Sequence, residues 1–181
     1  EEPTYAVIKT HDGFEVRRYA PYLVAETVVP GPAEEAGNLG FKILADYIFG
    51  NNRGEKKIAM TAPVSQTPVP VKLVMTAPVS QVATPGGFLV QFTMPAGYTL
   101  ATLPEPVDPR VKLREIPSTK VVVLRYSGGW SQATYDENLQ ALRQAVDKAG
   151  LATVGEPILS RYNSPFSLPF MRRNEIWLTL R

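Results

Sequence analysis

Two stretches of the chain share a pattern of apolar and polar positions. Residues 14–31 and residues 111–128 align without a gap at an offset of 97. In each stretch apolar and polar residues alternate, a proline follows (Pro21 and Pro117), and a second apolar run ends in glycine. Alternation with a period of two is typical of half-buried strands, and proline is common in the turns that join them. The pattern therefore predicts one β-hairpin in each stretch.

A helix is predicted after each hairpin. The first begins near Pro32 and ends at Gly50, because proline suits the first turn of a helix and glycine suits its C-terminal end. In the second helix, Thr134 and Glu137 have the spacing of a capping box, and Gly150 marks the end.

A strand is predicted after each helix, at residues 57–60 and 157–162. The chain then contains a β-β-α-β unit twice, in half-repeats of approximately 14–66 and 111–162. Two such units usually pack around a common core. We therefore expect one α+β domain, residues 1–181: a distorted antiparallel β-barrel from two pseudo-repeated halves, flanked by two α-helices. The alternative is a chance similarity between two α+β stretches.

The two predicted helices differ in their apolar faces. The second has a single stripe, typical of a surface helix with one buried face: Tyr135, Leu139, Leu142 and Val146. In the first, apolar residues occupy most of the circumference: Leu39, Phe41, Ile43, Leu44, Ala45, Tyr47, Ile48 and Phe49. One sheet cannot cover so wide an arc, so we expect another segment, a partner or a ligand against this helix.

A ten-residue motif occurs almost twice, at residues 57–66 and 72–81. Both copies contain Met-Thr-Ala-Pro-Val-Ser-Gln. The pattern predicts two strands joined by a turn at 67–71, with the motif prolines at strand ends, edges or bulges, because proline cannot donate to a sheet. Met60 and Met75 are better explained as core filler than as metal ligands.

Composition and charge exclude several classes of protein. Hydrophobic residues make up 44% of the chain and charged residues 20%, which argues against a disordered protein. Every apolar run is interrupted before the ~20 residues that a membrane span needs, so we expect a soluble protein without such a span. The net charge is +2, and the basic residues form scattered pairs rather than one basic face, which argues against a nucleic-acid partner.

Cysteine is absent from the sequence, which excludes disulfides, thiolate ligands and cysteine nucleophiles. The chain begins with Glu1 and not with methionine, so we expect that a signal peptide was removed or that the chain was shortened. Export and a cytoplasmic location both stay open, as does the oligomeric state.

Motifs along nearly the whole chain resemble the SOUL haem-binding family. They are Met-Thr-Ala-Pro-Val, the stretch 14–21, Met94-Pro95 followed by Tyr98-Thr-Leu100, and the ending Arg161-Tyr-Asn-Ser-Pro165 with Arg172-Arg-Asn-Glu-Ile-Trp177. The resemblance implies a distorted barrel of two pseudo-repeated halves. It also implies non-enzymatic binding of haem or a related tetrapyrrole, in an apolar groove between the first helix and the loop before the last strand.

The groove implied by this resemblance would be lined by apolar side chains from both segments: Phe41, Leu44, Ala45 and Ile48 from the helix, and Phe166, Leu168, Phe170 and Met171 from the loop. They would cover the rings of a small amphipathic ligand. Arg172 and Arg173 would bind its carboxylates through charge-assisted hydrogen bonds. Alternatively, the loop folds onto the first helix and completes the core.

An iron ligand is harder to assign from the sequence. Some family members have a histidine where this chain has Arg18, and arginine stays protonated and cannot ligate iron. The only histidine, His11, precedes an Asp-Gly pair that predicts a tight hairpin turn. Met171, Tyr162 and His11 are weak candidates, and haem bound without a protein ligand is the alternative.

The sequence contains no G-x-S-x-G or H-E-x-x-H motif. Glu175 is either a buried carboxyl with a raised pKa or a partner of Arg172 or Arg173 in an ion pair. The doubled unit also resembles bacterial effector-binding domains, some of which are catalytic. The alternatives to haem binding are therefore a small-molecule effector-binding or hydrolase-like barrel, and a protein-interaction module.

Overall fold

The structure, a computed structural model, describes residues 1–71, 84–163 and 166–181. Within these ranges the chain forms nine β-strands and two α-helices, which confirms the predicted α+β class. The strands are β1 (Tyr5–His11), β2 (Phe14–Tyr19), β3 (Tyr22–Pro30), β4 (Val64–Val71), β5 (Thr84–Thr93), β6 (Lys112–Ile116), β7 (Thr119–Tyr126), β8 (Thr153–Arg161) and β9 (Asn174–Leu180). The helices are α1 (Ala33–Ile48), α2 (Gln132–Lys148) and a short 3-10 helix, η1 (Pro169–Met171). Neither α-helix is long and apolar enough to cross a bilayer.

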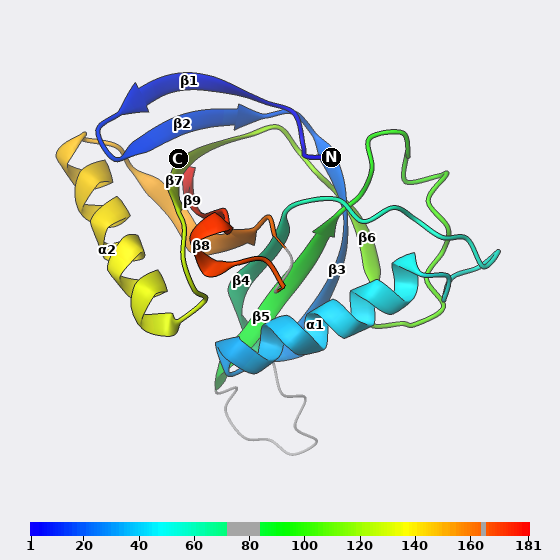
Figure 1. The fold of residues 1–181 in the computed structure, drawn as a ribbon. Coiled ribbons are helices and arrows are strands. Elements are labelled where there is room, and N and C mark those ends of the chain that lie inside the picture. The colour runs from blue at the N-terminus through cyan, green and yellow to red at the C-terminus, as the bar shows by residue number, and fades with distance from the viewer. Residues whose placement is uncertain (72–83, 164–165) are drawn as a thin grey trace, which may run out of the picture.

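The strands form one antiparallel sheet in the order β1-β2-β7-β9-β8-β4-β5-β3-β6. Figure 1 shows that the sheet is strongly curved and that α1 and α2 pack at well-separated positions along it. Helix α1 packs against β3 and β5, and α2 packs against β7. Strands β1 and β6 are the two ends of the order, and no pairing between described residues joins them. The predicted closed barrel is therefore not confirmed.

The two predicted hairpins are wrong. Strand β2 pairs with β1 and β7, whereas β3 pairs with β5 and β6. The chain turns a corner at Pro21 and again at Pro117, and the two bent segments pair with each other instead of with themselves. Tyr19 lies opposite Thr119 on one side of the corner, and pairing resumes at Tyr22 on the other. The hairpin predicted from the Asp-Gly pair after His11 is confirmed, since β1 and β2 pair up to His11 and Phe14.

The order of elements β2-β3-α1-β4 recurs as β6-β7-α2-β8. Exchanging β2, β3, β4 and β5 for β6, β7, β8 and β9 turns the strand order between β2 and β6 into its own reverse. A twofold relation between two halves of a sheet produces this arrangement. The equivalence of the half-repeats 14–66 and 111–162 nevertheless stays a prediction.

Of the two strands predicted after the helices, one is confirmed. Strand β8 covers most of 157–162. Residues 57–60 form no strand, because the Ile58 amide donates instead to the Ile48 carbonyl at the end of α1, at 2.8 Å. The turn predicted at 67–71 is also wrong, since β4 passes through it. The second copy of the ten-residue motif, 72–81, lies outside the described residues.

Proline is tolerated within β4 because of where the strand loses a neighbour. Strand β8 pairs with β4 only as far as Gln66. Beyond that point β4 pairs with β5 alone, and Pro68 lies opposite Phe88. A residue on the open side of a strand needs no ladder donor.

Helix α1 packs unusually close to the sheet. A Cβ atom added at Gly40 would lie 2.5 Å from Cγ2 of Val90 in β5, so only glycine fits there. The face toward the sheet is buried, whereas Leu39, Phe41 and Phe49 are exposed by 43%, 38% and 62% of their surfaces. The apolar arc of this helix is therefore wider than the sheet covers, as the sequence predicts.

Helix α2 begins one turn earlier than the predicted capping box. The hydroxyl of Ser131 accepts a hydrogen bond from the Thr134 amide at 3.1 Å, so Ser131 is the N-cap and Thr134 lies within the first turn. The predicted apolar stripe is confirmed: Leu142 and Val146 are buried against Val122 and Ile176, with Tyr135 and Leu139 partly buried beside them.

Candidate functional site

The larger of two neighbouring cavities lies beside α1 and has a volume of about 510 Å³. One wall is α1, which contributes Phe41. The segment leading into β4 contributes Met60 and Val64, and the end of β8 contributes Tyr162 and Asn163. The cavity therefore lies between α1 and the start of the segment that leads to β9.

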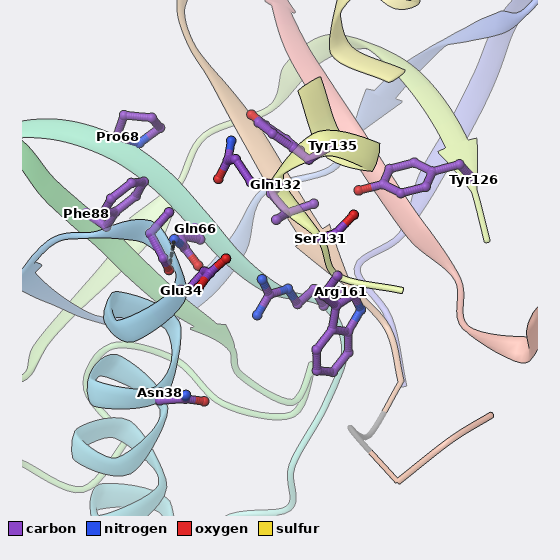
Figure 2. A pocket seen from close by; sticks show the side chains of 13 residues that line it. Glu34, Asn38, Gln66, Pro68, Phe88, Tyr126, Ser131, Gln132, Tyr135 and Arg161 are labelled. Carbon is purple, nitrogen blue, oxygen red and sulfur yellow. Dashed lines mark hydrogen bonds between the residues drawn. The ribbon is translucent and has the colours of Figure 1, made fainter. Parts of the chain in front are cut away.

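The smaller cavity, of about 280 Å³, lies between the N-terminal ends of α1 and α2. Figure 2 shows Glu34 and Asn38 on the α1 side, and Gln132 and Tyr135 on the α2 side, with Arg161 of β8 reaching between them. Apolar and aromatic side chains complete the wall: Pro68, Phe88, Tyr126, Trp130 and Leu159.

The two cavities share a wall that carries an arginine and a tryptophan. The guanidinium of Arg161 lies over the Trp130 ring at 4.7 Å, and that of Arg172 lies over the same ring at 4.4 Å. Arg161 and Trp130 line both cavities. Nε of Arg161 is buried without a hydrogen-bond partner. Such an atom normally carries a desolvation cost.

A buried ion-pair network lies next to the larger cavity and is centred on Glu175, which has no exposed surface. Arg17 donates to both of its carboxylate oxygens, at 2.9 and 3.0 Å. Arg173 donates to Oε2 at 3.0 Å, and the Tyr162 hydroxyl and the Trp177 indole donate to Oε1 at 2.7 and 3.0 Å. Tyr162 therefore connects the network to the cavity.

The network keeps Glu175 ionised. Burial acts to raise the pKa of Glu175, but the hydrogen bonds and charge of Arg17, with those of Trp177 and Tyr162, bring that pKa below its ordinary value. Burial and the charge of Glu175 raise the pKa of Tyr162, so its hydroxyl stays protonated. Of the two interpretations from the sequence, the ion pair with Arg173 is the one found here, and Arg17 is an additional partner.

The structure separates the predicted site residues of α1 into two groups. Phe41 lines the larger cavity and lies against Phe92, with the ring centroids 5.3 Å apart. Leu44 and Ile48 have no exposed surface, and Ala45 retains 7%. These three residues pack into the core beneath α1.

The predicted site residues of the loop are exposed: Phe166, Leu168, Phe170 and Met171 have exposed fractions of 95%, 55%, 72% and 64%. The segment lies against the cavity wall, because the Gly128 amide donates to the Pro169 carbonyl at 2.9 Å and Arg172 lies over Trp130. The alternative in which this loop completes the core is therefore wrong for these four side chains.

The three candidate iron ligands lie on three different segments of the chain. Tyr162 lines the larger cavity, and Met171 is in η1. His11 lies at the β1–β2 hairpin, stacked on Phe14, which belongs to the core beneath α2. No group of three or more histidine and acidic side chains that could hold a metal ion occurs among the residues with a described structure.

Sequence reasoning missed Arg161 and Trp130 as site residues. Trp130 belongs to no recognised motif. Arg161 opens the family-like stretch Arg161-Tyr-Asn-Ser-Pro165, but nothing local marks it as a cavity residue, and 31 positions separate it from Trp130. Antiparallel pairing of β4 with β8 brings Arg161 opposite Val64, which places it between the helices. Only the strand order, which the sequence did not predict, puts these two side chains together.

Comparison with known proteins gives a family and a fold. The family model described as SOUL heme-binding protein matches residues 1–179. Heme-binding protein 1 of Sus scrofa is 28% identical over 154 residues, which cover 81% of this chain and 72% of that protein.

Two solved structures share the fold at 12% sequence identity. The C-terminal domain of EcmrR has a TM-score of 0.67, covering 98% of each chain. A hydrolase from Listeria innocua has a TM-score of 0.56, covering 92% of this chain and 91% of that one. At this identity the likeness concerns the fold alone.

Proposed function

The chain belongs to the SOUL heme-binding protein family, and we propose that it binds haem or a related tetrapyrrole, without catalysing a reaction, in the larger cavity beside α1. The observation that carries the proposal is this cavity of about 510 Å³, next to an exposed apolar segment. Ligand pockets usually measure about 300–1,000 Å³ and have mostly apolar walls.

The apolar side chains supply most of the proposed binding. Phe41 reaches into the cavity from α1, and Phe166 and Phe170 extend from the segment beside it. Apolar side chains exposed together commonly mark a binding surface. In this proposal Leu44, Ala45 and Ile48 act indirectly: they do not line the cavity, and they hold α1 on the sheet.

Polar groups at the cavity have different proposed roles. Arg172 lies over Trp130 at the cavity wall and is proposed to bind a propionate. Arg173 is held by Glu175 and by Glu2, so its contribution is to the fold. Tyr162 keeps its proton, which makes it a poor ligand for iron, and His11 has no role in this proposal. Haem would supply its own redox and ligand-binding chemistry.

The architecture is proposed to be two equivalent halves that close a distorted barrel. Support comes from the strand order, which reverses onto itself when the halves are exchanged. The corner at Ala20 and Pro21 also joins β2, near one end of that order, to β3, near the other.

Titration with haemin, followed by its Soret absorption, tests the binding proposal. Phe41→Asp and Phe170→Asp should each weaken binding by about tenfold or more, because a carboxylate without a partner is costly to bury. Phe49→Asp is the matched control: Phe49 is also an exposed aromatic next to α1, but it does not line the cavity. Equal affinity of all four proteins, with the fold retained by circular dichroism, would refute the site.

The propionate role has a separate test. Arg172→Ala should lose several-fold in affinity for haemin and almost nothing for the dimethyl ester, since a partly solvated ion pair contributes on the order of 1 kcal/mol. His11→Ala should leave the haemin spectrum unchanged. A low-spin Soret band lost in His11→Ala would instead place the ligand near the β1–β2 hairpin.

A second candidate is the binding of a smaller organic molecule, as in effector-binding domains. The smaller cavity, with its aromatic wall and its arginine, favours it.

A further inference from the structure

The wall of the smaller cavity is rich in aromatic rings and carries one cationic side chain in its inner part. Phe88, Tyr126 and Tyr135 give it aromatic rings, and Trp130 adds an indole shared with the larger cavity. Burial raises the pKa of Tyr135 to about 12 and also raises that of Tyr126, so both phenols are neutral near pH 7. The guanidinium of Arg161 is then the one charge among the inner described residues of this wall.

Arg161 lies over the Trp130 ring but has no acidic partner among the described residues. Between the described residues no carboxylate lies within ion-pair distance of its guanidinium, and no hydrogen bond from its side chain is formed. Room for it exists because residue 37 is glycine: a Cβ there would lie 3.2 Å from Nη1 of Arg161. Burial lowers the pKa of Arg161, and the charge of Arg172 acts in the same direction.

The other polar groups of the cavity are engaged or peripheral. The Gln66 amide donates to the Ala33 carbonyl at 3.0 Å. The Ser131 hydroxyl donates to Thr134 Oγ1 and accepts from the Thr134 amide. Glu34, the acidic member of the lining, is exposed at the mouth. A ligand that enters between the helices therefore meets aromatic surface and one partly buried cation.

We propose that this cavity is a second binding site, specific for a small planar aromatic carboxylate, whose ring contacts Phe88, Tyr126 and Tyr135 and whose carboxylate pairs with Arg161. A volume of about 280 Å³ admits a ligand of one or two fused rings, at the lower end of ordinary ligand pockets. Guanidinium and carboxylate match in geometry and form two charge-assisted hydrogen bonds. The site needs no iron and no tetrapyrrole, so it stands independently of haem binding.

Calorimetric titration of the full chain with 2-naphthoate tests the proposal, with neutral 2-naphthamide and cationic 2-naphthylmethylammonium as probes of the same shape. The carboxylate should bind about tenfold or more tightly than either, because only it forms the charge-assisted pair. Equal affinities for the three probes would overturn the proposal without any variant.

Variants locate the site. Arg161→Gln should remove the preference for the carboxylate, whereas Arg172→Gln, which changes the other cation over Trp130 but no residue of the cavity lining, should keep it. Glu34→Gln should tighten naphthoate binding by removing a negative charge at the mouth. Naphthoate binding that is unaffected by Arg161→Gln would refute the role of this side chain.

One further pair of variants separates the two cavities. Gln132→Trp, at the mouth of the smaller cavity, should block naphthoate, and Phe41→Ala, in the larger cavity, should leave its affinity unchanged. The opposite result would place naphthoate in the larger cavity and overturn the second site. Haemin titrations of the same variants report on the larger cavity, so failure of one proposal is distinguishable from failure of the other.

Discussion

Glu175 is a fully buried carboxylate that holds four donors around it. Two of them, Arg17 and Arg173, are cations. A buried ion pair stabilises the fold only while both the anion and the cation are present. If one partner is removed, the other is left as an uncompensated charge in the protein interior. The network therefore makes the fold sensitive to single substitutions at its centre.

Glu175→Gln should lower the free energy of unfolding by about 3–5 kcal/mol, because it leaves Arg17 and Arg173 unpaired while buried or partly buried. Urea denaturation followed by circular dichroism measures this loss. The control is Glu105→Gln, which removes the partner of Arg53 in an exposed pair and should leave the stability unchanged. A loss no larger than that of the control would mean that the network is not stabilising.

The effect of Glu175 on stability should depend on pH. Its pKa in the folded state lies below the ordinary value, whereas in the unfolded chain it is about 4.3. Ionised Glu175 therefore stabilises the folded state at pH values above the pKa of the unfolded chain. This contribution to stability is lost as the pH falls through the pKa of the folded state. The stability difference between the wild type and Glu175→Gln should shrink when urea titrations are repeated from pH 7 down to pH 3. A constant difference would contradict the assignment.

The sequence predicted one of the two cations that pair with Glu175. Arg173 is two positions from Glu175, so both side chains lie on the same face of the extended chain and their pairing was foreseeable. Arg17 is 158 positions away, and only the pairing of β2 with β7 and of β7 with β9 brings it there. The importance of Arg161 could not be predicted either. It depends on the absence of a carboxylate within ion-pair distance among the described residues, and only the fold shows which residues lie near its guanidinium.

At the level of elements, the contact between α1 and β5 is set by one glycine. Gly40→Ala should lower stability by about 1–3 kcal/mol, although alanine favours helices, because its Cβ would overlap Val90. The same change should cost less in a Val90→Gly background, where the overlapping atoms are gone. A matched control is Gly97→Ala, since a Cβ at Gly97 meets no heavy atom within 4 Å. Additive losses at Gly40 and Val90 in thermal unfolding would contradict a direct clash.

Elements with strong local signals were predictable, and their pairing was not. Both α-helices follow from their apolar positions and from Pro32, Gly50 and Gly150 at their ends. The strands β2, β3, β6 and β7 also follow from alternation, but a proline between two apolar runs is compatible with a reversal or with a corner. Which one forms depends on whether the partner strand is the neighbour in sequence or, as here, one about 100 residues away.

At the scale of the whole molecule, the two halves depend on each other. Strand β2 pairs with β7, β3 with β6, and β4 with β8. Residues 1–110 produced alone should therefore lack a cooperative unfolding transition and a dispersed amide NMR spectrum, because three of their strands lose a partner. Mixing with residues 111–181 should restore both. A fragment 1–110 that folds alone would contradict this dependence.

The corner between β2 and β3 has a consequence for how the protein is made. During synthesis, β2, β3 and β4 leave the ribosome before β6, β7 and β8 exist, so their open edges stay available to other chains for several seconds at ordinary elongation rates. Unpaired strand edges are templates for aggregation. We therefore expect newly made chains to depend on chaperones until the second half has emerged, and slower elongation across residues 100–130 to lower the yield of folded protein.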